Sequence, residues 1–217
     1  MTKVTFNIAT SLDGFVAGPN ASLEEPLGEG GEALHDWAFA TKAWREPHGE
    51  PGGEDNPSSR ILADTFEATG AVIVGRRMFS SGEGPWESDP KADSWWGEEP
   101  PFHVPVFVLT HHARESVEKK GGTTFHFVTD GIESALERAR AAAGDRNVAI
   151  GGGAQTIQQY LRAGLVDEFR LDVAPLLLGG GVSLFGELGG DAPQVVVEQT
   201  RAVEGPAATH VFYRVVK

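Results

Sequence analysis

The chain has 217 residues, enough for one domain with a substantial core, and we expect a single domain over residues 1–217. It contains no cysteine, which excludes disulfides, zinc–thiolate sites and cysteine nucleophiles. Its formal net charge of −13 argues against nucleic acids and anionic membrane surfaces as partners, because both select basic patches. We find neither a secretory signal nor an apolar run of the roughly 18 residues that a membrane span needs, so we expect a cytoplasmic protein.

The first element is a strand that ends in polar residues. Apolar and polar residues alternate from Thr2 to Ala9, which predicts a strand buried on one face. Ser11 and Asp13 follow at once, where an open α/β sheet binds its ligands. Asp13 is therefore a candidate for contact with a ligand, although it could also serve only as an Asx-turn residue.

Two helices and two loop insertions come next. Residues 32–44 have a helical pattern, in which Asp36 and Trp37 could line a pocket, although Trp37 could equally be plain core. Residues 59–69 form the second predicted helix. Residues 46–59 and 81–101 are rich in Gly, Pro, Glu and Asp, and we expect both to be loop insertions.

A second strand opens into glycine and arginine. The apolar run Ala71–Val74 predicts a strand covered on both faces, and it is followed by Gly75, Arg76 and Arg77. Arginine binds phosphate through a planar fork of donors, so these residues are candidates for an anion site. They could instead solvate the start of a helix or pair with the many carboxylates of the chain.

A third buried strand, Val104–Leu109, leads into Thr110 and then into two adjacent histidines. Adjacent histidines point in different directions, and no third ligand falls at a suitable spacing. We therefore expect no metal site, and we interpret this strand end as a further place for an anion.

The strongest local signal is the glycine turn after the strand Asn147–Ile150. Gly151, Gly152 and Gly153 follow this strand, and a helical pattern begins at Ala154 and Gln155. Glycine permits close approach of a ligand, and the unpaired N–H groups of a helix start attract phosphate. The glycines could also do no more than pack the turn against the sheet, because a single glycine triplet is a weak motif.

The remaining elements complete a mixed sheet. We expect strands at 123–128 and 165–175, a helix at 131–143, and an antiparallel pair at 194–202 and 208–216. The count is about eight strands and four helices. The fold class is α/β, with a mostly parallel sheet and an antiparallel C-terminal edge.

Three strand ends that can bind anions suggest one extended ligand with several phosphates, and a dinucleotide fits best. The usual fingerprint of a first-strand G-x-G-x-x-G followed by an acid is absent, so a different sheet fold is implied. Arginine at the second strand end, without an acid for a ribose hydroxyl, favours NADP over NAD.

Several motifs together resemble those of a known family. Residues 11–17 match S-x-D-G-x-[IV]-A, residues 74–79 match V-G-R-x-[TM]-[FY], and residues 150–153 match a glycine loop. Residues 164–168 match G-L-[VI]-D-E, and residues 175–181 match P-x-[LV]-L-G-x-G. In this order, from Val4 to about Tyr213, they resemble dihydrofolate-reductase-like proteins that share the C-terminal reductase domain of bacterial riboflavin biosynthesis.

The resemblance implies a three-layer dihydrofolate reductase-like fold and an NADPH-dependent reductase of a small pterin- or pyrimidine-like substrate, often as a homodimer. By position, the residues implied in cofactor binding are Gly75, Arg76, Arg77, Thr110, Gly151, Gly152, Gly153, Ala154 and Gln155. Those implied near the nicotinamide and the substrate are Ser11, Ala17 and Trp37, with Asp13 and then Asp36 as the candidate catalytic carboxylates.

The chain also departs from the family at the substrate side. The riboflavin-pathway reductases carry a Glu just before the glycines, where this chain has Ile150. The riboflavin step is therefore not assigned. Two other functions stay open: a non-catalytic ligand-binding protein that retains the fold, and a flavin- or quinone-directed reductase.

Overall fold

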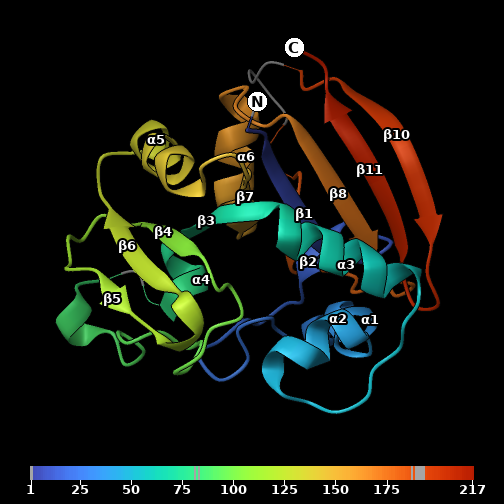
Figure 1. Cartoon of the computed structure of the whole chain (residues 1–217), viewed down its shortest axis with the longest axis horizontal. Helices are drawn as coiled ribbons and strands as arrows, with labels where there is room; N and C mark the ends of the chain where they lie inside the picture. Colours follow the sequence, from blue (N-terminus) through green and yellow to red (C-terminus); the bar gives the residue numbers. More distant parts are fainter. Residues whose placement is uncertain (1, 81, 83, 187, 189–193) are drawn as a thin grey trace.

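The computed structural model describes residues 2–80, 82, 84–186, 188 and 194–217 (Figure 1). Nine strands of this part form one sheet in the order β10–β11–β8–β1–β7–β3–β4–β6–β5. Six neighbouring strands, β8 to β6, are parallel, while β5 at one edge and the β11–β10 pair at the other run antiparallel. The expected mostly parallel sheet with an antiparallel C-terminal edge is confirmed, with one strand more than the eight expected.

The strands have the following bounds: β1 (Val4–Thr10), β3 (Thr69–Gly75), β4 (Pro105–Leu109), β5 (Val117–Glu118), β6 (Thr124–Val128), β7 (Asn147–Gly152), β8 (Glu168–Val173), β10 (Val197–Glu204) and β11 (Thr209–Val215). A separate pair joins β2 (Phe15–Ala17) to β9 (Val182–Ser183).

Helices cover both faces of the sheet. On one face, α5 (Ile132–Ala143) and α6 (Ala154–Arg162) pack on the largest apolar cluster, which includes the fully buried Val4 and Phe6 of β1. On the other lie α3 (Pro57–Ala68) and α4 (Arg76–Ser80), with α1 (Asp36–Phe39) and α2 (Lys42–Arg45) beside α3 (Figure 1). This three-layer arrangement follows from the alternation of side chains along each strand, which gives the sheet two faces to cover.

The prediction of one helix over residues 32–44 is wrong. This segment forms three short pieces, the 3₁₀ helix Gly31–His35 and then α1 and α2. The break is at Thr41, which is buried and extended (φ −84°, ψ 151°). Its hydroxyl donates to the Ala38 carbonyl at 2.6 Å and accepts from the Trp44 N–H at 3.3 Å, so one residue ends the first helix and caps the second.

The two insertions are more ordered than their composition suggests. Asn56 accepts a hydrogen bond from the Ser59 N–H at 3.0 Å and caps α3, which therefore begins at Pro57, inside the first insertion. In the second insertion, Trp95 and Trp96 donate their indole N–H groups to the Met78 carbonyl at 2.5 and 2.8 Å. This segment is thus fastened to α4. Within the described residues, no helix is both long and apolar enough to cross a membrane.

Candidate active site

The strand ends that the sequence singled out lie next to one another. β7, β3 and β4 are neighbours and parallel, with Val74 paired to Gly152 and Gly75 paired to Leu109. Gly75, the glycine turn and Thr110 therefore come together at the carboxyl edge of the sheet, where α/β folds bind ligands.

The three glycines of the turn have different surroundings. A Cβ on Gly151 would lie 3.0 Å from a Val72 methyl group and 3.1 Å from a Val74 methyl group, so a side chain here would require these neighbours to shift. Gly152 has φ +122° and forms a cis peptide bond with Gly153. Gly153 is exposed, is the N-cap of α6, and a Cβ there would meet nothing within 4 Å. A side chain at Gly153 would thus meet open space beside the start of α6.

The first turn of α6 presents backbone donors to that space. The N–H groups of Thr156 and Ile157 bond to the Gly153 carbonyl, at 3.0 and 3.2 Å, whereas those of Ala154 and Gln155 precede any intrahelical acceptor. Gln155 is exposed and Ala154 is buried. The arrangement fits a phosphate held by backbone amides and the helix dipole.

Gly75 serves the packing of α6. A Cβ at this position would lie 2.6 Å from the Thr156 hydroxyl oxygen, so a side chain here would force the Thr156 side chain to move. Gly75 and Gly151 thus lie close to their neighbours, whereas Gly153 borders open space, and the cofactor-binding role of all three stays a prediction.

Arg76 already has a carboxylate partner. Its Nη2 lies 2.6 Å from Asp89 of the second insertion, the guanidinium also donates to Ser80, and Trp86 stacks on it at 3.4 Å. Burial lowers the pKa of Arg76. Burial also opposes ionisation of Asp89, but donors from Ser80, Lys91 and Arg76 outweigh it and lower the pKa of that carboxyl.

The other predicted phosphate-binding side chains differ in exposure. Arg77 is exposed at the start of α4, whereas Thr110 is 8% exposed. The Thr110 hydroxyl accepts a hydrogen bond from the His112 N–H at 3.1 Å, so it orders the turn after β4.

Asp13 joins two loops of the same edge. Its carboxylate accepts hydrogen bonds from the N–H groups of Leu178 and Gly179, at 3.2 and 2.7 Å. The hydrogen bond from Ser11 makes the largest contribution to lowering the pKa of Asp13. Ser11 is buried and accepts from the Phe15 N–H at 3.0 Å, and Ala17 lies in β2. This loop is thus held in shape by its own polar groups.

Asp36 and Trp37 are positioned by the α1 layer rather than by the strand ends. Asp36 is exposed at the start of α1. Trp37 is 6% exposed and packs with Leu62 and Ala208, with its ring edge-on to His210 at 4.9 Å. Its core environment matches the alternative interpretation of this tryptophan.

Sequence reasoning missed a buried polar network beneath α3. Ser58 Oγ lies 2.8 Å from His210 Nε2, and His210 Nδ1 lies 2.6 Å from Asp172 Oδ1. Arg170 donates to both oxygens of Asp172, at 2.7 and 3.1 Å. These residues are at most 3% exposed, and their hydrogen bonds join α3 to β8 and β11. Their separations of 38 and 152 residues left no local signal.

The network shifts the ionisation of its members. Burial raises the pKa of Asp172, but donors from His210 and Arg170 outweigh it and hold that pKa below its usual range. Burial lowers the pKa of the nearby His35. Among the described residues, no group of three or more His, Asp or Glu side chains is arranged to hold a metal ion.

Comparison with known proteins relates the chain to a family of reductase domains and to a bacterial protein of similar length. The family model of the RibD C-terminal domain matches residues 2–208. The Bacillus subtilis (strain 168) protein YwjB is 34% identical over 186 residues, which cover 86% of this chain and 84% of YwjB.

Solved structures share the fold. A Shewanella sp. PV-4 protein named for riboflavin biosynthesis aligns over 100% of both chains with a TM-score of 0.61 and 24% identity. Dihydrofolate reductase from Enterococcus faecalis, solved with NADP(H), aligns with a TM-score of 0.54 and 14% identity over 99% of this chain and 97% of its own. The expected dihydrofolate reductase-like fold is confirmed, and the chain belongs to the RibD C-terminal domain family.

Proposed function

We propose that this protein is an NADPH-dependent reductase of a small pterin- or pyrimidine-like heterocycle. The observation that carries the proposal is the open space in front of Gly153, with the first amides of α6 beside it and the ends of β3 and β4 as neighbours. The family and the shared fold support a reductase, since the Enterococcus faecalis enzyme of this fold was solved with NADP(H).

In this proposal backbone N–H groups make most of the contacts that hold the cofactor. Gly153, Ala154 and Gln155 would receive the pyrophosphate at the start of α6. The 2′-phosphate would lie near the start of α4, where Arg77 is exposed and Arg76 is paired with Asp89. Phosphate binding by Arg76 would exchange one anionic partner, Asp89, for another.

When bound, NADPH supplies a hydride to the acceptor, and a proton must come from elsewhere. The lowered pKa of Asp13 keeps this carboxyl ionised at neutral pH, so it is better suited to orient a substrate N–H group than to donate a proton. We propose that water delivers the proton. Asp36 remains the second candidate for contact with the substrate.

The direct test is whether the wild-type protein binds the cofactor. Fluorescence titrations with NADPH and with NADH measure this. We expect tight binding with a preference for NADPH. Gly153→Val should fold normally and lose at least about tenfold in NADPH affinity, which is 1.4 kcal/mol. Ala141→Val, on the exposed face of α5, is the matched control and should bind normally.

Each other outcome identifies an alternative. Unchanged affinity in Gly153→Val would remove the phosphate role of the turn, and failure of wild-type protein to bind either nucleotide would end the enzyme proposal. Binding without turnover of any pterin, pyrimidine or related carbonyl acceptor would favour the non-catalytic ligand-binding function. A yellow protein as purified would favour the flavin-directed reductase.

The family resemblance also leads us to propose a homodimer and a cytoplasmic location.

A further inference from the structure

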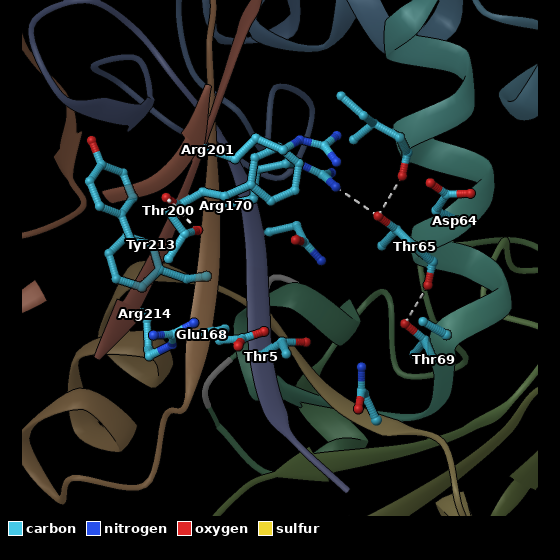
Figure 2. Close-up of a pocket in the computed structure, with 16 residues that line it drawn as sticks. Thr5, Asp64, Thr65, Thr69, Glu168, Arg170, Thr200, Arg201, Tyr213 and Arg214 are labelled. Atoms are coloured by element: carbon cyan, nitrogen blue, oxygen red, sulfur yellow. Dashed lines mark hydrogen bonds between the residues drawn. The ribbon is translucent and has the colours of Figure 1, made fainter. Parts of the chain in front are cut away.

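Cavities open at the amino ends of the parallel strands, opposite the edge with the glycine turn. One, of about 250 Å³, lies between α3 and a floor made by β1, β8, β11 and β10, with Asp64 on the helix and Arg201 on the sheet (Figure 2). Its charges of both signs favour neither an anion nor a cation. Another cavity, of about 170 Å³, differs in this respect and points to a definite class of ligand.

The smaller cavity lies between the two insertions, and we call it the insertion pocket. Its lining comes from the 3₁₀ helix Glu46–His48, from Phe66 near the end of α3, from residues 101–104 and from Arg146. Val104 directly precedes Pro105, the first residue of β4, and Arg146 directly precedes β7. The insertion pocket is therefore at the opposite end of the parallel strands from the glycine turn.

The walls of the insertion pocket are apolar and partly aromatic. Five of its lining residues are Pro47, Phe66, Pro101, Phe102 and Val104. The Phe102 ring is edge-on to Trp96 and Phe125, with ring centres 5.1 and 6.1 Å apart, so its position is set by the neighbouring core. An apolar cavity of about 150 Å³ accommodates benzene, so this one is large enough for a single aromatic ring.

The polar side chains of the insertion pocket are all nitrogen bases. Arg146 donates from Nη1 to the Thr69 carbonyl at 3.0 Å, which leaves its Nε–Nη2 edge for a ligand. Within the described residues, no Asp or Glu lines the pocket and no carboxylate lies within ion-pair distance of Arg146. On a chain with a net charge of −13, this pocket is thus locally basic. It favours an anion, and the planar fork of arginine matches a carboxylate.

Two histidines are held in place beside this arginine. His48 Nδ1 lies 2.6 Å from the Trp44 carbonyl, and His103 Nδ1 lies 2.8 Å from the Gly121 carbonyl. A carbonyl oxygen only accepts, so each Nδ1 carries a hydrogen and each Nε2 is left for other contacts. His103 has a left-handed backbone with φ +52°, and its N–H donates to the buried Thr123 hydroxyl at 3.0 Å. Such a backbone is uncommon outside glycine and concentrates at ligand sites.

We propose that the insertion pocket is a second binding site, for a small aromatic carboxylate. The ring would lie against Phe66 and Phe102, and the carboxylate would meet the Nε–Nη2 edge of Arg146, with Nε2 of either histidine as a further donor when that ring is protonated. An inorganic anion would leave the aromatic walls uncovered. The proposed reductase reaction makes no use of this pocket, so the two proposals fail or succeed separately.

The test is the binding of benzoate to the full chain, measured by isothermal titration calorimetry without any nucleotide. We expect one benzoate to bind per chain. Acetate lacks the ring and benzyl alcohol lacks the charge, so each should bind at least about tenfold more weakly, and so should inorganic phosphate. Arg146→Gln removes the partner of the carboxylate, and Phe66→Ala removes one wall. Each should raise the dissociation constant for benzoate at least about tenfold.

Two matched controls make the same changes at exposed positions outside the pocket: Arg140→Gln on α5 and Phe185→Ala should both bind benzoate normally. Circular dichroism checks that every variant is folded. Failure of the wild-type protein to bind benzoate, or benzyl alcohol or phosphate binding as tightly as benzoate, would overturn the proposal. So would wild-type affinity for benzoate in folded Arg146→Gln or Phe66→Ala, because benzoate would then bind elsewhere on the chain.

Discussion

The guanidinium of Arg76 lies 2.6 Å from the carboxylate of Asp89, and the two side chains are only 8% and 1% exposed. This ion pair fastens the second insertion to the end of β3, at the edge where we propose that the cofactor binds. A buried charge that loses its partner strongly destabilises a protein. Removing one partner of this pair therefore tests whether it anchors the second insertion.

Asp89→Ala should lower the free energy of unfolding by about 3–5 kcal/mol, because it leaves the Arg76 guanidinium buried without an anion. Urea unfolding followed by circular dichroism measures this. The matched control is Asp93→Ala, since Asp93 pairs with Arg114 but is 89% exposed. That change should cost less than about 1 kcal/mol. Equal losses for the two variants would show that Asp89 is not an anchor.

Arg77→Ala should reduce the ratio of NADPH to NADH affinity, because Arg77 is exposed at the start of α4, on the edge where the 2′-phosphate would lie. Arg76→Ala should reduce the same ratio only if phosphate displaces Asp89, and it should also destabilise the fold. Titration of both nucleotides, with thermal unfolding alongside, separates these roles. If both variants kept the wild-type ratio of NADPH to NADH affinity, neither arginine would recognise the 2′-phosphate.

Gly151→Val should destabilise the protein even without a ligand, because Val72 and Val74 lie 3.0 and 3.1 Å from the position of its Cβ. Overpacking of this kind typically costs about 1–3 kcal/mol. Thermal unfolding of Gly151→Val and Gly153→Val compares a filled position with an open one. Equal unfolding temperatures for the two variants would contradict the distinction between a closely packed Gly151 and an open Gly153.

Stability should fall as the pH drops below the ordinary pKa of histidine, in part because of His35. Its folded pKa is lowered by burial, so the folded state prefers the neutral ring. The stabilisation is therefore complete above the unfolded pKa of about 6.5 and is lost as pH falls towards the lower folded value. His35→Gln should flatten the melting temperature between about pH 5 and 8. His111→Gln, at an exposed position, should keep the wild-type slope.

Asp172→Asn should cost about 3–5 kcal/mol, because Arg170 and His210 would both lose a buried anionic partner. Since the pKa of Asp172 is lowered, its contribution is present above the unfolded pKa and is lost as the pH falls through the folded value. Urea unfolding at neutral and acidic pH checks both points. A stability loss that was the same at every pH would contradict this assignment.

The sequence by itself determined the elements whose signals are local. Alternation along β1 and the apolar run of β3 predicted buried strands, because side chains on a strand point to its two faces in turn. The turn at Gly151–Gly153 predicted a helix start, and α6 begins at Ala154. The family motifs, read in order, were sufficient for the fold.

Only the tertiary structure decided which side chains meet. Thr41 breaks the helix because its buried hydroxyl donates to the Ala38 carbonyl and accepts a hydrogen bond from the Trp44 N–H. The periodicity of apolar residues contains no sign of these two hydrogen bonds. Nothing in the sequence distinguished Asp89 from the other acidic residues, and only the fold shows that it pairs with Arg76. Asp172 and His210 are 38 residues apart and adjacent only because β8 pairs with β11. Long-range pairing depends on packing and desolvation across the whole sheet, and a single sequence records those forces only at the positions where they also leave a local pattern.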